Sequence, residues 1–143
     1  MDDFFRFATM KGGGHRLELT GPIVTSRPWW SEDGEQFACS TEFDAQLKAL
    51  EGEELTVVID SNGGDVAAGI AMYEALRNRK GETHCHIVRA YSAATLPLCA
   101  VPRRNRMISP VGTILIHDPA TSVSGTADEL DKSVRFLRAI KTA

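Results

Sequence analysis

The sequence predicts an α/β domain built around a mostly parallel central sheet. Segments with strand-like and helix-like periodicity alternate along the chain, which is the order of βαβ units. The run LTVVID at residues 55–60 is apolar and β-branched throughout, as expected for a strand buried on both faces. The chain has 143 residues, of which 43% are hydrophobic and 24% charged, so its size and composition fit one globular domain.

The first fourteen residues are expected to form a flexible N-terminal arm, because residues 11–14 read Lys-Gly-Gly-Gly. Phe4, Phe5 and Phe7 are too apolar for a free tail, so we expect them to dock on this subunit or on a neighbour. The folded domain is then predicted to span residues 15–143.

The first strand and the loop after it come next. Residues 15–23 alternate apolar and polar side chains and contain Gly21-Pro22, which predicts a strand ended by a turn. Residues 24–39 form a polar loop that carries Trp29 and Trp30. Two interpretations remain open for these tryptophans: they plug the edge of their own core, or they contact another subunit, since aromatic residues are enriched at interfaces.

Periodicity predicts the remaining elements. A helix with Thr41 as its N-cap begins near residue 40 and ends at Gly52, where glycine permits the closing turn. A last amphipathic helix over residues 127–140 has an apolar stripe of Leu130, Val134 and Leu137. The other expected elements are a helix at 66–80, a strand at 83–90, a helix at 92–101, and short strands at 107–108 and 114–116.

Charge and apolar content argue against two classes of partner. The net charge is −3, from 16 basic and 19 acidic residues, so the domain has no overall positive field to attract nucleic acid. No apolar run approaches the roughly 18–20 residues that cross a bilayer, and the N-terminus has neither the basic region nor the apolar region of a secretory signal.

Cysteine and histidine usage points to a cytoplasmic protein that needs no metal or cofactor. The three cysteines are widely spaced and form no Cys-x-x-Cys pattern, which fits a reducing compartment. His84 and His86 share one strand face, but Cys85 points to the opposite face and no acidic residue completes a ligand set.

Three places in the chain carry candidate chemistry. At residues 60–65 (DSNGGD) a strand passes into a helix through two glycines, a turn whose backbone N–H groups can bind negative charge. Ser92 follows the next strand and starts a helix, and His117 ends the apolar run after that. Taken singly, each place has a plainer interpretation. The glycines only allow a turn, Ser92 is an N-cap, a position for which Thr95 is an alternative, and His117 is a structural histidine.

Together the three segments resemble the ClpP family of serine peptidases, most closely the ClpP-like proteases of phage genomes. The resemblance lies in VIDSNGGDVAAGIAMY at residues 58–73, YSAAT at 91–95 and ILIHDP at 114–119. Their order and spacing extend the similarity from about Leu17 to the end of the chain. The resemblance implies repeated ββα units around a parallel sheet, a homo-oligomeric ring, and polypeptide substrates.

The resemblance also implies a role for individual residues. Ser92 matches the nucleophile and His117 the general base, while the amides of Gly64 and Ala93 match the donors of the oxyanion hole. An extended peptide is expected to bind along Gly63, Asp65 and Val66 and beyond His117. Expected partners are an unfoldase ATPase or, in a phage, capsid or scaffold proteins processed by cleavage.

Three departures from the family pattern leave alternatives open. Asn62 stands where proline is usual, and Val88 or Arg89 stands near a usual glycine. No residue matches the downstream acid that orients the histidine, and the domain is expected to be truncated at its C-terminus. The chain is therefore expected to be a serine endopeptidase or, alternatively, a catalytically inactive assembly subunit of the same fold. A crotonase-type acyl-thioester enzyme is a third candidate, but the sequence shows no pair of acidic residues that could serve as the catalytic pair of such an enzyme.

Overall fold

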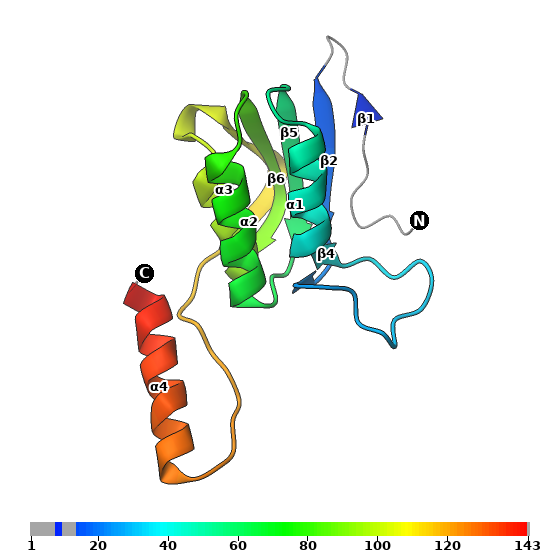
Figure 1. The fold of residues 1–143 in the computed structure, drawn as a ribbon. Coiled ribbons are helices and arrows are strands. Elements are labelled where there is room, and N and C mark those ends of the chain that lie inside the picture. Colours follow the sequence, from blue (N-terminus) through cyan, green and yellow to red (C-terminus); the bar gives the residue numbers. More distant parts are fainter. Residues whose placement is uncertain (1–7, 10–13, 143) are drawn as a thin grey trace.

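The computed structural model describes residues 8–9 and 14–142, and its centre is a five-stranded sheet with the order β1-β2-β5-β6-β7. The strands β2, β5, β6 and β7 run parallel, and β1 pairs antiparallel with β2 at one edge (Figure 1). Their bounds are β1 Ala8–Thr9, β2 His15–Thr20, β5 Leu55–Ser61, β6 Thr83–Tyr91 and β7 Arg106–Leu115. The predicted α/β fold with a mostly parallel sheet is confirmed.

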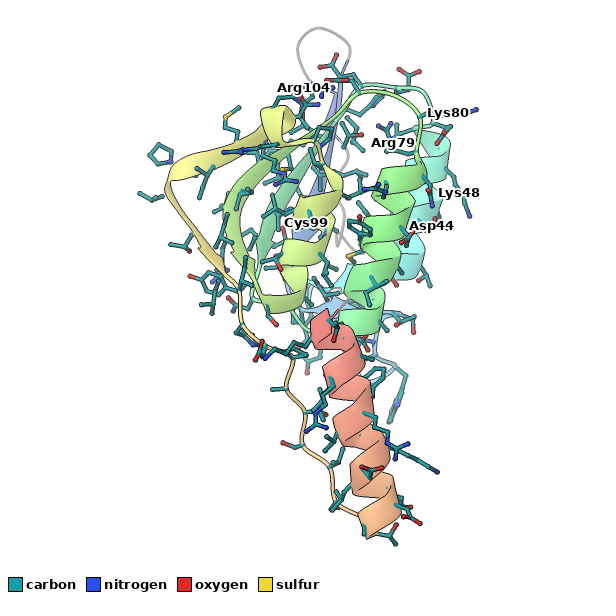
Figure 2. The ribbon with its side chains drawn as sticks, turned by 90° about the vertical axis from the view of Figure 1, so that its left-hand side faces the viewer. Asp44, Lys48, Arg79, Lys80, Cys99 and Arg104 are labelled. Carbon is teal, nitrogen blue, oxygen red and sulfur yellow. The ribbon has the colours of Figure 1, made fainter. Side chains whose placement is uncertain are left out.

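Helices cover one face of this sheet. In Figure 1, α1, α2 and α3 lie in front of the strands, and the view of Figure 2 places them on the same side. The helices are α1 Ser40–Ala49, α2 Val66–Asn78, α3 Thr95–Ala100 and α4 Ala127–Thr142, with single 3-10 turns η1 Ser92–Ala94 and η2 Arg103–Asn105. A small parallel sheet of β3 Ile23–Val24 and β4 Ala38–Cys39 precedes α1.

The hydrophobic core fills the space between the sheet and α1–α3. Phe43 of α1 and Met72 of α2 are fully buried in one cluster with Val57 and Ile59 of β5. Alternate residues of a strand face opposite sides, so the odd-numbered apolar residues of β5 point to the helices. Burying such side chains, at about 25 cal/mol per Å² of apolar surface, is the main stabilising contribution.

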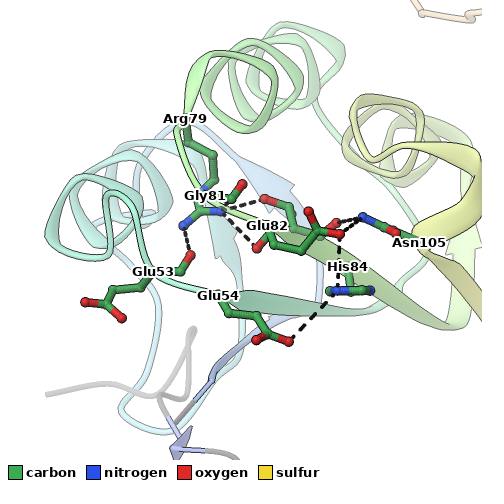
Figure 3. A network of polar contacts seen from close by, with 8 residues as sticks. Glu53, Glu54, Arg79, Gly81, Glu82, His84 and Asn105 are labelled. Carbon is green, nitrogen blue, oxygen red and sulfur yellow. Dashed lines mark hydrogen bonds and ion pairs between the residues drawn. The ribbon is translucent and has the colours of Figure 1, made fainter. Parts of the chain in front are cut away.

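Arg79, after α2, joins the loops at the end of the sheet opposite the candidate site. Its guanidinium donates to the carbonyls of Leu50 (2.8 Å) and Glu53 (2.7 Å) and to the hydroxyl of Thr83 (2.6 Å), as Figure 3 shows in part. Burial lowers the pKa of this guanidinium. Nearby, Glu82 accepts from the Asn105 amide at 2.8 Å, so the network also reaches the start of β7.

The structure corrects two predicted element types. The expected helix 92–101 is a 3-10 turn followed by α3. Proline has no N–H and is tolerated only in the first turn of an α-helix, so Pro97 is incompatible with an α-helix that begins at Ser92. The two short strands expected at 107–108 and 114–116 are one strand, β7, interrupted by a break in its pairing with β6.

The cap predicted for α1 is also wrong. Helix α1 begins at Ser40, as expected, but Cys39 occupies the N-cap position, two residues before the predicted cap and without a side-chain bond. Thr41 lies inside the first turn, where its hydroxyl donates to the carbonyl of Thr25 at 3.0 Å. The long-range bond to the preceding loop therefore replaces the local capping bond.

The loop of residues 25–37 does not use its tryptophans to plug the core. Trp29 is 94% exposed and Trp30 is 61% exposed, with Trp30 resting edge-on against Phe37 at a centroid distance of 6.4 Å. Arg27 orders the loop instead, donating to the Ser31 hydroxyl at 2.9 Å and lying over the Phe37 ring. The first interpretation of these tryptophans is wrong, and the subunit contact stays a prediction.

The N-terminal arm contains a strand that was not predicted, and the last helix lies apart from the rest of the domain. Residues 8–9, inside the predicted flexible arm, form β1 against His15 and Arg16, whereas Phe4, Phe5 and Phe7 lie outside the described residues. Helix α4 projects from the body after an extended linker (Figure 1), and it buries none of its described residues. No helix in the described ranges is long and apolar enough to span a membrane.

Candidate active site

Three neighbouring strands bring the predicted site segments to one edge of the sheet. The carboxyl ends of parallel strands meet at the same edge, where α/β proteins commonly bind ligands. Ser61 of β5 pairs in register with Ala90 of β6, and Tyr91 of β6 pairs with Leu115 of β7. The glycine turn, Ser92 and His117 therefore follow three adjacent strand ends.

The glycine turn is held from behind by β3. The N–H of Ile23 donates to the carbonyl of Gly63 at 2.9 Å, and the N–H of Asp65 donates to the carbonyl of Ile23 at 2.9 Å. A Cβ on Gly64 would lie 2.4 Å from the Ile23 carbonyl oxygen, so only glycine fits at this approach. The Ser61 hydroxyl completes the support, because it accepts from the Gly63 N–H at 3.1 Å and donates to the Gly21 carbonyl.

Gly63 packs directly against the turn that contains the predicted nucleophile. Its φ is +95°, and a Cβ there would lie 2.5 Å from the Tyr91 carbonyl oxygen, 2.8 Å from the Ser92 Cβ and 3.1 Å from the Ala93 nitrogen. Glycine is therefore required at this position both for its backbone conformation and for its small size. The absence of a side chain lets the β5 turn and the β6 turn touch.

Ser92 has a strained backbone. Its φ is +56°, which is the left-handed region and makes it the one non-glycine residue with a positive φ among the described residues. The Thr95 hydroxyl donates to the Ser92 carbonyl at 2.6 Å and so fixes the turn after it. Strain of this kind clusters at functional sites, where the surroundings must hold it. The half-buried serine stands at the start of a short helical segment.

Two backbone N–H groups near Ser92 are available to bind a negative charge. No described residue accepts a hydrogen bond from the N–H of Gly64 or of Ala93. Because Gly63 and Asp65 bond to Ile23 on one side, the N–H of Gly64 points to the other side, as alternate groups of an extended chain do. The buried Ala93 touches Gly63, so both amides lie at the junction of the two turns.

His117 lies two residues beyond the end of β7 and is exposed. Its Nδ1 is 2.6 Å from the carbonyl oxygen of Asp118, and the Asp118 carboxylate pairs with Lys141 of α4 at 2.8 Å. Among the described residues, no hydrogen bond joins His117 to Ser92 and no carboxylate bonds to the imidazole. The structure brings the two residues to the same edge of the sheet without joining them.

The predicted substrate-binding residues surround the start of α2. Gly63 is buried and supports the Ser92 turn, as described above. The Asp65 carboxylate caps α2 by accepting from the Ala68 N–H at 3.0 Å, which indicates a structural role for that side chain. Val66 is half-buried in the first turn. A separate groove of about 600 Å³ lies between α1 and α2, and none of the predicted site residues lines it.

Of the two histidines considered for a metal site, His84 has acidic neighbours. The Nε2 of His84 lies 3.7 Å from a Glu82 oxygen and 4.0 Å from a Glu54 oxygen (Figure 3), and Cys85 is buried on the other face of β6. In the part of the chain that the structure describes, no three histidine, cysteine or acidic residues gather as a metal would require.

Sequence reasoning missed the two residues that hold the glycine turn. Ile23 contributes only backbone groups, so nothing in its side chain signals the role. Ser61 could have been found from its position two residues before Gly63, since serine hydroxyls commonly bond to backbone two residues on.

A comparison with known families matches the family model described as Clp protease to residues 35–143. The chain belongs to the Clp protease family. The matched region contains the glycine turn, Ser92 and His117, together with all the helices that cover the sheet. Clp proteases are peptidases that typically form oligomeric rings and act on polypeptides.

Proposed function

We propose that this chain is a serine endopeptidase in which Ser92 is the nucleophile, His117 the general base, and the amides of Gly64 and Ala93 the oxyanion hole. The observation that carries the proposal is the contact of Gly63 with the strained Ser92 turn, which leaves two unpartnered N–H groups beside one hydroxyl. A serine in this setting suits acyl transfer, since a hydroxyl, a base and paired amides are the parts that reaction uses.

In the proposed reaction the Ser92 hydroxyl attacks the carbonyl carbon of the scissile peptide bond. His117 takes the hydroxyl proton and later returns it to the leaving amine, as in other serine hydrolases. The Gly64 and Ala93 N–H groups donate to the oxyanion that forms, and losing one such donor costs roughly 10²–10³ in rate. Water then releases the acyl group with His117 again as base.

For His117 to act, its imidazole must turn from the Asp118 carbonyl toward Ser92. The histidine is exposed at the end of a strand, so the side chain has room to change rotamer. Catalytic hydrogen bonds are often long or absent before substrate binds, so an open arrangement is compatible with activity.

The substrate is proposed to be an extended polypeptide. The free side of the Gly64 backbone offers main-chain groups to an added strand next to Gly63, Asp65 and Val66, and the extended segment after His117 offers a second edge. Such pairing recognises the backbone of a peptide and leaves its side chains to other contacts.

Assembly into a homo-oligomeric ring is proposed to involve α4. Leu130 is 38% exposed, Val134 42% and Phe136 62%, so the helix presents apolar side chains that a neighbouring subunit would cover. We further propose a cytoplasmic location and a partner that delivers polypeptides, either an unfoldase ATPase or, in a phage, capsid or scaffold proteins.

A catalytically inactive assembly subunit is the second candidate. It is favoured by one observation: His117 bonds to a backbone carbonyl, and no described carboxylate orients its ring. Losing the orienting acid of a triad costs on the order of 10⁴ in kcat even when the geometry stays intact.

Labelling with a fluorophosphonate probe separates the two candidates. We expect the purified chain to be labelled at Ser92 and Ser92→Ala to be unlabelled, while Ser133→Ala on α4, the control, is labelled like the unaltered chain. Hydrolysis of an unfolded fluorescent protein substrate should follow the same order. A chain that is labelled nowhere, or labelled equally after Ser92→Ala, would contradict the proposed enzyme.

A further inference from the structure

Two side-chain bonds cross between the strands immediately before the site. The Nε of Arg89, on β6, donates to the Oδ1 of Asp60, on β5, at 3.0 Å. On the other side of β6, the hydroxyls of Tyr91 and Thr113, on β7, lie 2.7 Å apart and share a hydrogen bond. The three strands that lead into the glycine turn, Ser92 and His117 are therefore tied together by side chains.

A β-bulge at Val88 makes these bonds possible. Ile59 pairs with Ile87, but Asp60 pairs with Arg89, so Val88 is the extra residue on β6. Before the bulge the odd-numbered residues of β6 are buried against the helices, and after it Ala90 is buried instead. The bulge thus turns Arg89 away from the core, onto the open face where Asp60 lies. Bulges beside active sites commonly redirect a side chain in this way.

The bonds end close to each reacting group. Asp60 is two residues before Asn62 and three before Gly63, and its carbonyl also accepts from the Gly21 N–H at 3.3 Å. Tyr91 directly precedes Ser92, and Thr113 is four residues before His117 on β7. A change in either bond therefore acts on the relative positions of these segments.

Neither bond contributes much to global stability. The side chains of Asp60 and Arg89 are 35% and 44% exposed. In an exposed ion pair, solvent screening and the lost side-chain entropy largely offset the attraction between the charges. The Tyr91–Thr113 bond is also exposed. Their value lies in geometry, because a catalytic group must be held within about 0.5 Å of its productive position.

We propose that Asp60, Arg89, Tyr91 and Thr113 are positioning residues that set the oxyanion amides, Ser92 and His117 relative to one another. We call these four residues the cross-strand brace. The inference rests on the proposed peptidase function, because it concerns the alignment of that site. Ser92 has a strained backbone, and Gly63 packs against its turn. The surrounding structure must hold such strain, so the positions of the three strand ends need a restraint that the short turns do not provide.

The test removes each bond without removing bulk. Asp60→Asn and Arg89→Gln weaken the ion pair, and Tyr91→Phe removes only a hydroxyl. We expect the rate of fluorophosphonate labelling to fall about tenfold for each variant. A displacement of 1 Å costs about 10²-fold in rate, so a displacement well under 1 Å is sufficient for this loss. For a peptide substrate, kcat falls while KM stays within about twofold, since an alignment defect acts mainly after binding.

The matched control is the ion pair of Asp44 and Lys48 on α1, another exposed pair of an aspartate with a basic side chain, at 2.7 Å (Figure 2). Asp44→Asn should leave the labelling rate unchanged and shift the melting temperature as little as Asp60→Asn does. Arg89→Lys keeps a charged donor and should recover part of the rate lost in Arg89→Gln. A merely structural role predicts instead that the rate follows the melting temperature.

Amide hydrogen exchange gives a readout that does not need enzyme activity. We expect peptides covering residues 60–66 and 90–96 to exchange faster in Asp60→Asn than in the unaltered chain, with no change in Asp44→Asn. Faster exchange in a chain that the probe never labels would support the brace and overturn the peptidase proposal. Unchanged exchange and labelling in Asp60→Asn and Tyr91→Phe would overturn the brace, whether or not the chain is an enzyme.

Discussion

Replacing Gly63 by alanine tests whether the glycine turn positions the nucleophile. The added Cβ would lie 2.5 Å from the Tyr91 carbonyl oxygen and 2.8 Å from the Ser92 Cβ, whereas ordinary contacts begin near 3.4 Å. The Ser92 turn must therefore move by about 0.9 Å relative to the glycine turn. A displacement of about 1 Å at a catalytic group costs about 10²-fold in rate.

The same substitution also has a conformational cost that must be separated from the displacement. Gly63 has φ +95°, and an alanine in the left-handed region costs roughly 1–2 kcal/mol. Overpacking adds about 1–3 kcal/mol, so Gly63→Ala should lower the free energy of unfolding by about 2–5 kcal/mol. Gly34→Ala is the matched control, because Gly34 has φ +91° and a Cβ there meets nothing within 4 Å.

The assay compares both variants by urea unfolding and by the rate at which a fluorophosphonate labels Ser92 in the folded protein at low temperature. We expect Gly34→Ala to lose about 1–2 kcal/mol of stability and none of its labelling rate. Gly63→Ala should be labelled about 10²-fold more slowly. A folded Gly63→Ala variant that is labelled as fast as Gly34→Ala would refute the argument that this contact sets the position of Ser92.

Four further predictions concern stability, thiol reactivity, pH dependence and assembly. Arg79→Ala should lower the free energy of unfolding by about 2–4 kcal/mol, measured in urea, because the carbonyls of Leu50, in a buried contact, and Glu53, in a partly buried one, lose their donor. Burial raises the pKa of the Cys39 and Cys85 thiols to about 11 each, so iodoacetamide at pH 8 should add one adduct, at the exposed Cys99, and a second adduct in the folded protein would contradict this. Unfolded thiols ionise near pH 8.5, so these two cysteines should make the protein lose stability as the pH rises from there toward 11, which urea midpoints across that range will check. Val134→Asp should reduce the solution mass if α4 joins subunits, and an unchanged oligomer in light scattering would place the interface elsewhere.

The geometry also explains why this site is built from backbone as much as from side chains. The N–H groups of Gly64 and Ala93 are aimed by bonds that other atoms make: Ile23 holds one turn and Thr95 the other. As the proposed oxyanion hole, these preorganised donors would need no rearrangement when charge develops. The Ser92 turn and α3 approach α2 closely at Gly69, where a Cβ would lie 3.0 Å from the Ala93 carbonyl oxygen and 2.9 Å from the Leu96 Cδ1 of α3. Small residues therefore set the packing on both sides of the Ser92 turn.

Local pattern was sufficient for most of the elements. The β-branched run at residues 55–60 became β5, and the two-residue alternation of residues 15–20 became β2, because strand periodicity directly reflects which face is buried. The order of the three motifs was also readable, since parallel strands place their ends at one edge. Thr41 was predicted wrongly as a cap because its bond to Thr25 is a tertiary contact. The single helix over 92–101 was wrong for a local reason, since Pro97 is incompatible with an α-helix that begins at Ser92.

By itself, the amino-acid sequence determined the alternation of strands and helices, the glycines of the β5 turn, and the placement of a serine and a histidine just after neighbouring strands. Only the tertiary structure decided the positive φ of Ser92, the contact of Gly63 with its turn, and the Val88 bulge that turns Arg89 toward Asp60. The physical reason is that periodicity records burial along one segment. The register between strands and the close approach of two backbones depend on packing among segments that are far apart in the chain.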